Sequence, residues 1–67
     1  MVAGPRHRRP YRVVFTRPGE QRSGTVVAPD EATAHQEARA IARDGAVAEV
    51  QYVPDTGDRS ILAVYRP

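Results

Sequence analysis

Hydrophobic and polar residues alternate along much of the chain with the period of two that marks a β-strand. Residues 11–16 alternate in this way, and the short run 24–28 is rich in β-branched residues, so both segments predict strands. Pro18 and Gly19 between them suit the centre of a type II turn, because proline presets φ and glycine accepts a positive φ. We therefore expect a first hairpin.

The stretch that follows has the helical period instead. Asp30 is placed to cap a helix, with Glu31 in the first turn, and the pair Asp44 and Gly45 supplies a stop. Apolar or small residues recur between them at helical spacing, which predicts one amphipathic helix. The residues of this stripe are Ala34, Ala38, Ile41, Ala42 and Gly45.

Residues 46–53 and 60–66 alternate again, and the turn-forming residues 54–58 separate them, which predicts a second hairpin. The order ββαββ indicates an α+β fold, a single domain over residues 10–67 with a four-stranded, mainly antiparallel sheet and one helix on one face. Residues 1–9 carry little that would offset the entropy of ordering, so we expect a flexible basic arm there. The pattern leaves the strand order open.

One helix covers one face of such a sheet. The residues expected on the covered face are Tyr11, Val13, Phe15, Val50, Tyr52, Ile61, Ala63 and Tyr65. The other face also carries apolar residues, which in a one-helix domain indicates a partner, either a second copy or another protein. The candidate interface residues are Val14, Val47, Leu62 and Val64. A register slip of one residue, or a bulge that reverses a strand, remains the alternative explanation.

Composition narrows the class of protein. The chain has 67 residues and no cysteine, so disulfides and cysteine zinc sites are excluded, and oligomerisation is a natural support for so small a domain. No apolar run approaches the length needed to span a bilayer, and no apolar segment follows the basic residues near the start. We expect a cytoplasmic protein that does not enter membranes.

Charge is unevenly distributed along the chain. Residues 1–22 contain six arginines and one acidic residue, whereas residues 23–67 contain four arginines and seven acidic residues. A basic front half suggests an anionic partner such as DNA or RNA, since arginines that neutralise phosphates supply most non-specific nucleic-acid affinity. The alternative is a solubilising arm and an ordinary solvated helix face. The candidate nucleic-acid-binding residues are Arg6, Arg8, Arg9, Arg12, Arg17, Arg22, Arg39 and Arg43.

Catalysis and cofactor binding have little support in the sequence. The chain has no cysteine or lysine, and a set such as Ser60, His35 and Asp58 lacks any surrounding nucleophile or phosphate-loop motif. Its two histidines, His7 and His35, are too far apart for a zinc-binding pair. We therefore expect a non-enzymatic binding module with no cofactor or metal. Nucleic-acid binding is the first hypothesis, and protein interaction or homodimerisation is the alternative.

Overall fold

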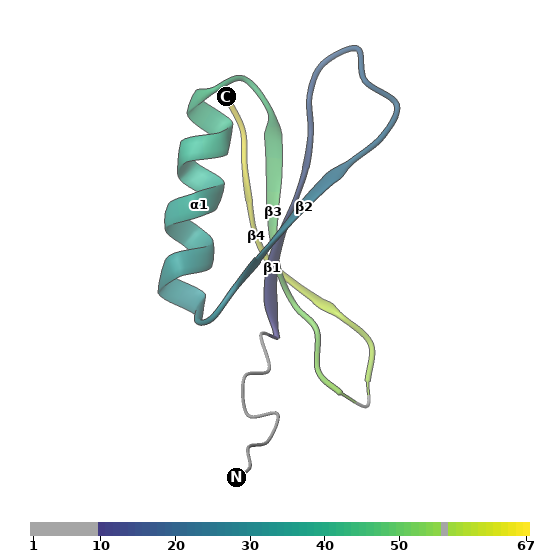
Figure 1. Ribbon diagram of the computed structural model, residues 1–67, viewed down its shortest axis with the longest axis vertical. Helices are drawn as coiled ribbons and strands as arrows, with labels where there is room; N and C mark the ends of the chain where they lie inside the picture. Colours follow the sequence, from purple (N-terminus) through teal and green to yellow (C-terminus); the bar gives the residue numbers. More distant parts are fainter. Residues whose placement is uncertain (1–9, 56) are drawn as a thin grey trace, which may run out of the picture.

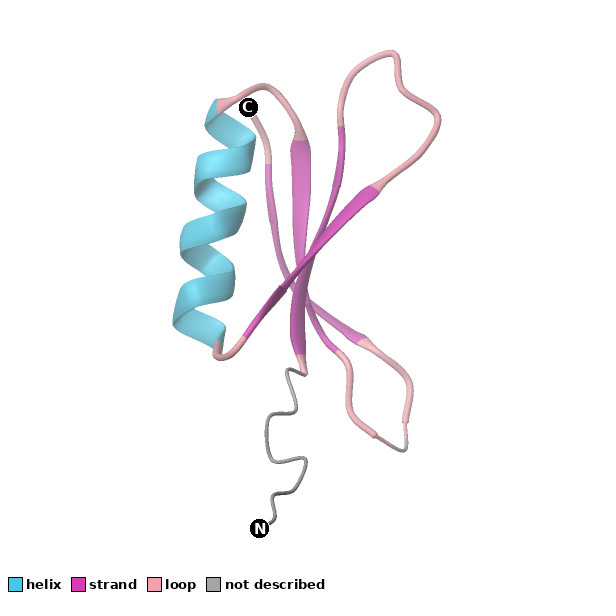
Figure 2. Ribbon diagram, viewed as in Figure 1, coloured by secondary structure: helices cyan, strands magenta, loops and turns pink. Residues whose placement is uncertain are grey.

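The computed structural model describes residues 10–55 and 57–67, and its elements follow the predicted order ββαββ. The first hairpin contains β1 (Tyr11–Thr16) and β2 (Gly24–Ala28), followed by α1 (Glu31–Arg43). The second hairpin contains β3 (Val47–Tyr52) and β4 (Ser60–Tyr65). Figure 1 shows α1 lying along one face of the sheet, and Figure 2 shows that the remaining described chain is turns and loops. The arm predicted over residues 1–9 lies outside the described residues.

Local signals in the sequence set the ends of these elements. The side chain of Asp30 accepts a hydrogen bond from the backbone N–H of Thr33 at 2.7 Å, which caps α1. After α1, Gly45 has the positive φ of 107° that ends many helices. In the first hairpin Gly19 has φ 83°, and the N–H of Glu20 bonds the carbonyl of Arg17 at 3.0 Å. The predicted turn and both predicted helix ends are confirmed.

The sheet is antiparallel throughout and has the strand order β2-β1-β3-β4. The first strands of the two hairpins, β1 and β3, therefore pair at the centre, and β2 and β4 form the edges. The chain reaches β3 from β2 through α1, which crosses the covered face (Figure 1). The order that the sequence left open is thus decided by pairing between β1 and β3.

Cross-strand register assigns the residues of the covered face, because residues directly opposite each other point to the same side. Its central row contains Val26, Val13, Val50 and Ala63. Beneath α1, the buried residues are small: Val13 and Val50 are the largest fully buried side chains in the described part of the chain. Tyr11, Phe15, Ile41 and Tyr65 pack around this centre with part of their surface in solvent. The core is therefore thin, as the alanine stripe of the helix predicts.

The prediction that Ile61 lies in the core is wrong. A bulge in the pairing of β3 with β4 places Ile61 opposite Gln51 and Ala63 opposite Val50, so that Leu62 is the extra residue. Gln51 lies on the uncovered face, and Ile61 accordingly has 55% of its surface exposed. The sequence allowed, as an alternative, a bulge that reverses the two faces of a strand, and such a bulge occurs in the first half of β4.

Candidate binding surfaces

The uncovered side of the sheet, here called the open face, has two complete rows of paired residues. One row contains Val27, Arg12, Gln51 and Ile61, in the order of the strands. The next row contains Thr25, Val14, Glu49 and Val64. Beside them, Thr16 pairs with Val47 at the end of the central strands. The register thus places Val14, Val47 and Val64 of the candidate interface on the open face, and Leu62 lies at the bulge on its edge.

A short polar network occupies the centre of the open face. The Nε of Arg12 donates to Oε1 of Gln51 at 3.1 Å, and the amide nitrogen of Gln51 donates to Oε1 of Glu49 at 3.0 Å. Gln51 is only 4% exposed, so its two hydrogen bonds satisfy an amide that would otherwise be costly to bury. Arg12 is thereby held against the sheet, which limits its freedom to reach a phosphate.

Apolar side chains flank this network on both edges of the sheet. Val27 of β2 is 52% exposed, and Leu62 and Val64 of β4 are 41% and 43% exposed. Together with Ile61 they are the exposed large hydrophobic residues of the described chain. Such a grouping, with a polar centre and apolar margins on one face, is typical of an interaction surface.

Besides Arg12, two more of the candidate nucleic-acid-binding arginines have partners among the described residues. The guanidinium of Arg17 lies 5.1 Å from the centre of the Phe15 ring and 3.7 Å from a carboxylate oxygen of Asp44. The guanidinium of Arg39 lies 5.6 Å from the centre of the Tyr65 ring. All three contacts are on the surface and weak, so they orient these arginines without neutralising them.

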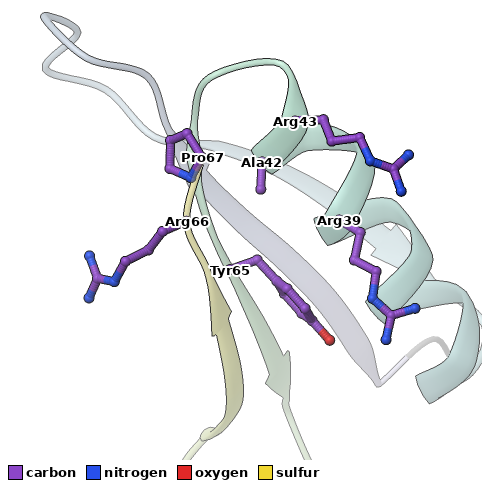
Figure 3. Close-up of a pocket in the computed structure, with 6 residues that line it drawn as sticks. All are labelled: Arg39, Ala42, Arg43, Tyr65, Arg66 and Pro67. Atoms are coloured by element: carbon purple, nitrogen blue, oxygen red, sulfur yellow. The ribbon is translucent and has the colours of Figure 1, made fainter.

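A shallow groove of about 330 Å³ lies between the last turns of α1 and the end of β4. Figure 3 shows Arg39 extending from α1 toward Tyr65, whereas the guanidinium of Arg43 points outward from the last turn of α1 and that of Arg66 points the opposite way from β4. Ala42 forms part of the wall that α1 contributes. Arg39 therefore places one cation beside the aromatic ring of this groove, and Arg43 and Arg66 contribute to its wall.

The two ends of the sheet differ in charge. Figure 1 shows the β1–β2 loop, the end of α1 and the C-terminus at one end of the sheet. The bounds of these elements place Arg17, Arg22, Arg43 and Arg66 there, against Glu20 and Asp44. At the opposite end, the element bounds place one arginine of the described residues, Arg59, against Asp30, Glu31, Asp55 and Asp58. Arg22 and Arg43 are exposed at the basic end. Pro10 adjoins the acidic end, because β1 runs about 20 Å from there to Arg17.

Arg6, Arg8 and Arg9 lie outside the described residues. Over residues 10–67 the sequence has seven arginines and eight acidic residues, so the excess of positive charge comes from these three. Pro10, to which these three residues connect along the chain, lies at the acidic end of the sheet, whereas Arg43 lies at the basic end.

His35 does not meet the serine and aspartate with which the sequence allowed it to be combined. Its Nδ1 lies 2.7 Å from the hydroxyl of Tyr65, and its Nε2 lies 3.2 Å from Oε2 of Glu31. Within residues 10–55 and 57–67, no group of three histidine, aspartate or glutamate side chains is arranged to hold a metal ion. The same residues contain no helix with the length and apolar character required to cross a membrane.

None of the candidate surfaces drawn from the sequence included Val27, Glu49, Gln51 or Ile61, which all contribute to the open face. Alternation along 46–53 already placed Glu49 and Gln51 on one side of their strand. Their partner Arg12 lies 39 positions from Gln51, however, and no local pattern connects the two. Comparison with protein-family models, with curated proteins and with solved structures gives no match.

Proposed function

We propose that this chain is a non-enzymatic binding module that assembles into a homodimer through the open face of its sheet. The observation that carries the proposal is the arrangement of exposed Val27, Ile61, Leu62 and Val64 around the Arg12–Gln51–Glu49 network. A face with one arginine, one glutamate and apolar margins is complementary to itself. Self-complementarity is what a two-fold symmetric interface requires.

The thin core gives the same proposal a thermodynamic reason. The largest fully buried side chains of the described chain are two valines, so the folded monomer removes little apolar surface from water per residue. A second copy placed on the open face covers the large apolar side chains that α1 leaves exposed. Dimerisation would therefore supply stability that neither a disulfide nor a larger core provides here.

The available area is sufficient for a specific but weak dimer. Four strands about 4.8 Å apart and about 20 Å long cover about 19 by 20 Å. The accessible surface of the face is larger than this projected area because side chains protrude from it, so two facing copies bury on the order of 1,000 Å² in total. This value is at the lower end for specific protein interfaces, and it predicts dissociation in the micromolar range.

Sedimentation equilibrium of the full chain from about 10 µM to about 1 mM tests the proposal. We expect a monomer–dimer equilibrium that the double variant Ile61→Thr/Val64→Thr weakens about tenfold or more, because threonine keeps the β-branched shape but reduces the apolar area. Ala32→Ser, on the exposed first turn of α1, is the control and should leave the equilibrium unchanged. A chain that stays monomeric over the whole range contradicts the proposal.

Polyanion binding is a second candidate, and the charge difference between the two ends of the sheet favours it. Arg22 and Arg43 are exposed at the basic end, and Arg39 and Arg43 line the groove beside Tyr65. Phosphates of DNA or RNA fit such a surface, with aromatic and guanidinium groups available for bases. In a dimer, two basic ends would act on one nucleic acid, so the two candidates are compatible.

Titration of labelled duplex DNA and single-stranded RNA at about 50 and about 200 mM salt tests this candidate. We expect affinity that falls steeply with salt and that decreases in the variant Arg39→Gln/Arg43→Gln. A second variant, Arg6→Gln/Arg8→Gln/Arg9→Gln, separates the contribution of the arm from that of the basic end. Absence of binding at the lower salt concentration contradicts polyanion binding and leaves the dimer proposal unaffected.

A further inference from the structure

The order of residues on the open face selects one way for two copies to face each other. Arg12 and Gln51 are directly opposite on the central strands, and so are Val14 and Glu49 in the adjacent row. These residues form a four-membered block in which Arg12 and Glu49 occupy one diagonal. We infer that the copies pack with strands crossing steeply, so that Arg12 of one copy pairs with Glu49 of the partner subunit. This inference rests on the proposed homodimer.

Four simple two-fold axes run through the block, and they differ in the charges they bring together. An axis along the strands places Arg12 over Gln51 of the partner subunit, and an axis across the strands places it over Val14 of the partner subunit. Neither axis brings opposite charges together. The axis along the diagonal of Arg12 and Glu49 places each of these two residues over the same residue of the partner subunit. Like charges then face each other, which is repulsive.

The remaining axis runs along the diagonal of Val14 and Gln51. It exchanges the positions of Arg12 and Glu49, and therefore creates two identical ion pairs across the interface. The strands of the two copies then cross at a large angle, which belongs to the orthogonal class of sheet packing rather than the aligned class. On this axis Val14 lies over Val14 of the partner subunit and Gln51 lies over Gln51 of the partner subunit, so one apolar contact and one amide contact flank the line between the two ion pairs.

The polar network has the capacity for these ion pairs. Between described residues, the bonds to Gln51 use the Nε of Arg12 and the Oε1 of Glu49. The terminal nitrogens of the guanidinium and the second carboxylate oxygen remain for the partner subunit. Within one copy Arg12 and Glu49 are diagonal neighbours, which lie about 7–8 Å apart along the sheet, and Gln51 bridges them. Gln51 thus positions both charged groups for contact with the partner.

Charge-reversal variants in separate chains test this arrangement. Arg12→Glu creates a face with two acids, and Glu49→Arg creates a face with two arginines, so each variant alone should self-associate about tenfold or more weakly than the original chain. An equimolar mixture should form a heterodimer with affinity within about threefold of the original homodimer. Both ion pairs are present in it, one as in the original chain and the other with its two charges exchanged. Native mass spectrometry with one chain isotopically labelled distinguishes the heterodimer from either homodimer.

The controls keep failure of the orientation separate from failure of the dimer. Arg22→Glu in the β1–β2 loop and Glu37→Arg on the exposed side of α1 make the same charge changes away from the open face, and should leave self-association unchanged. Circular dichroism melts show whether each variant is folded. If one single variant unfolds, chains with Arg12→Gln and Glu49→Gln replace the reversals, because their heterodimer contains one ion pair and either homodimer contains none. The inference is overturned if the original chain dimerises and each single charge reversal dimerises equally well. It is also overturned if the original chain dimerises but the mixture of the two variants forms no heterodimer. An original chain that is monomeric contradicts the dimer itself.

Discussion

The hydroxyl of Tyr65 and the imidazole of His35 form a hydrogen bond, 2.7 Å long, between the edge strand β4 and α1. The other ring nitrogen of His35 faces the carboxylate of Glu31, which accepts hydrogen bonds and so fixes the proton on Nε2. Nδ1 of the neutral ring then accepts from the tyrosine. The edges of the two rings also meet, with centroids 5.8 Å apart.

Tyr65→Phe keeps the ring and removes this hydrogen bond. We expect a loss of about 1 kcal/mol in the free energy of unfolding, because a partly buried imidazole nitrogen is left without its donor. Urea denaturation monitored by circular dichroism measures the change. Tyr52→Phe is the matched control, since the Tyr52 ring packs on Tyr11 at 5.3 Å through its faces and edges rather than its hydroxyl. Equal losses in both variants would contradict the role of the His35 contact.

Gly24 is opposite Phe15 in the first hairpin, and the ring of Phe15 covers the position that a side chain at residue 24 would take. A Cβ at Gly24 would overlap Cζ of the ring and lie 2.7 Å from Cε2. We therefore expect Gly24→Ala to displace Phe15 from the core margin and to lower the free energy of unfolding by about 1–3 kcal/mol. Gly57→Ala is the control, because its Cβ would meet only Pro54 at 3.5 Å. A stability equal to that of the original chain would show that the ring moves without cost.

The cap of α1 predicts a dependence of stability on pH. Hydrogen bonds from the backbone and side chain of Thr33 hold the pKa of Asp30 below its ordinary value of 3.8. A carboxyl group whose pKa is lower in the folded state stabilises the fold at pH values above 3.8, and this contribution disappears as the pH falls through the lower, folded value. We expect Asp30→Ala to lower the melting temperature at pH 7 and to differ progressively less from the original chain below pH 3.8.

Asp30→Asn is the matched variant for this experiment. Asparagine also accepts the hydrogen bond from the N–H of Thr33 but does not titrate. Its stability at pH 7 should stay close to that of the original chain. A difference between Asp30→Ala and the original chain that persists undiminished at the lowest pH would contradict the role of the ionised carboxylate.

Ala38 is fully buried where α1 lies against the sheet. The small side chains of the helix allow this close approach, so a larger residue at this position has no space. We expect Ala38→Leu to lower the free energy of unfolding by about 1–3 kcal/mol through overpacking. Ala40→Leu, on the exposed side of the same helix, should be close to neutral. Both are measured by urea denaturation, and equal effects at the two positions would contradict the close approach of the helix.

The sequence by itself determined the elements and their order. The alternation of β1, the cap at Asp30, the stop at Gly45 and the turn at Pro18 and Gly19 depend on neighbouring residues in the chain. Period, capping and turn conformation are local properties, and residues a few positions apart are sufficient to specify them. For this reason the predicted ββαββ order and the single helix on an antiparallel sheet agree with the structure.

Tertiary structure alone decided the contents of the open face. Pairing of β1 with β3 brings Arg12 to Gln51, and the bulge in β4 moves Ile61 from the expected core to the surface. Each result depends on which distant strands are neighbours and on their register. A shift of one residue exchanges the two faces, and alternation along a single strand contains no information about that choice.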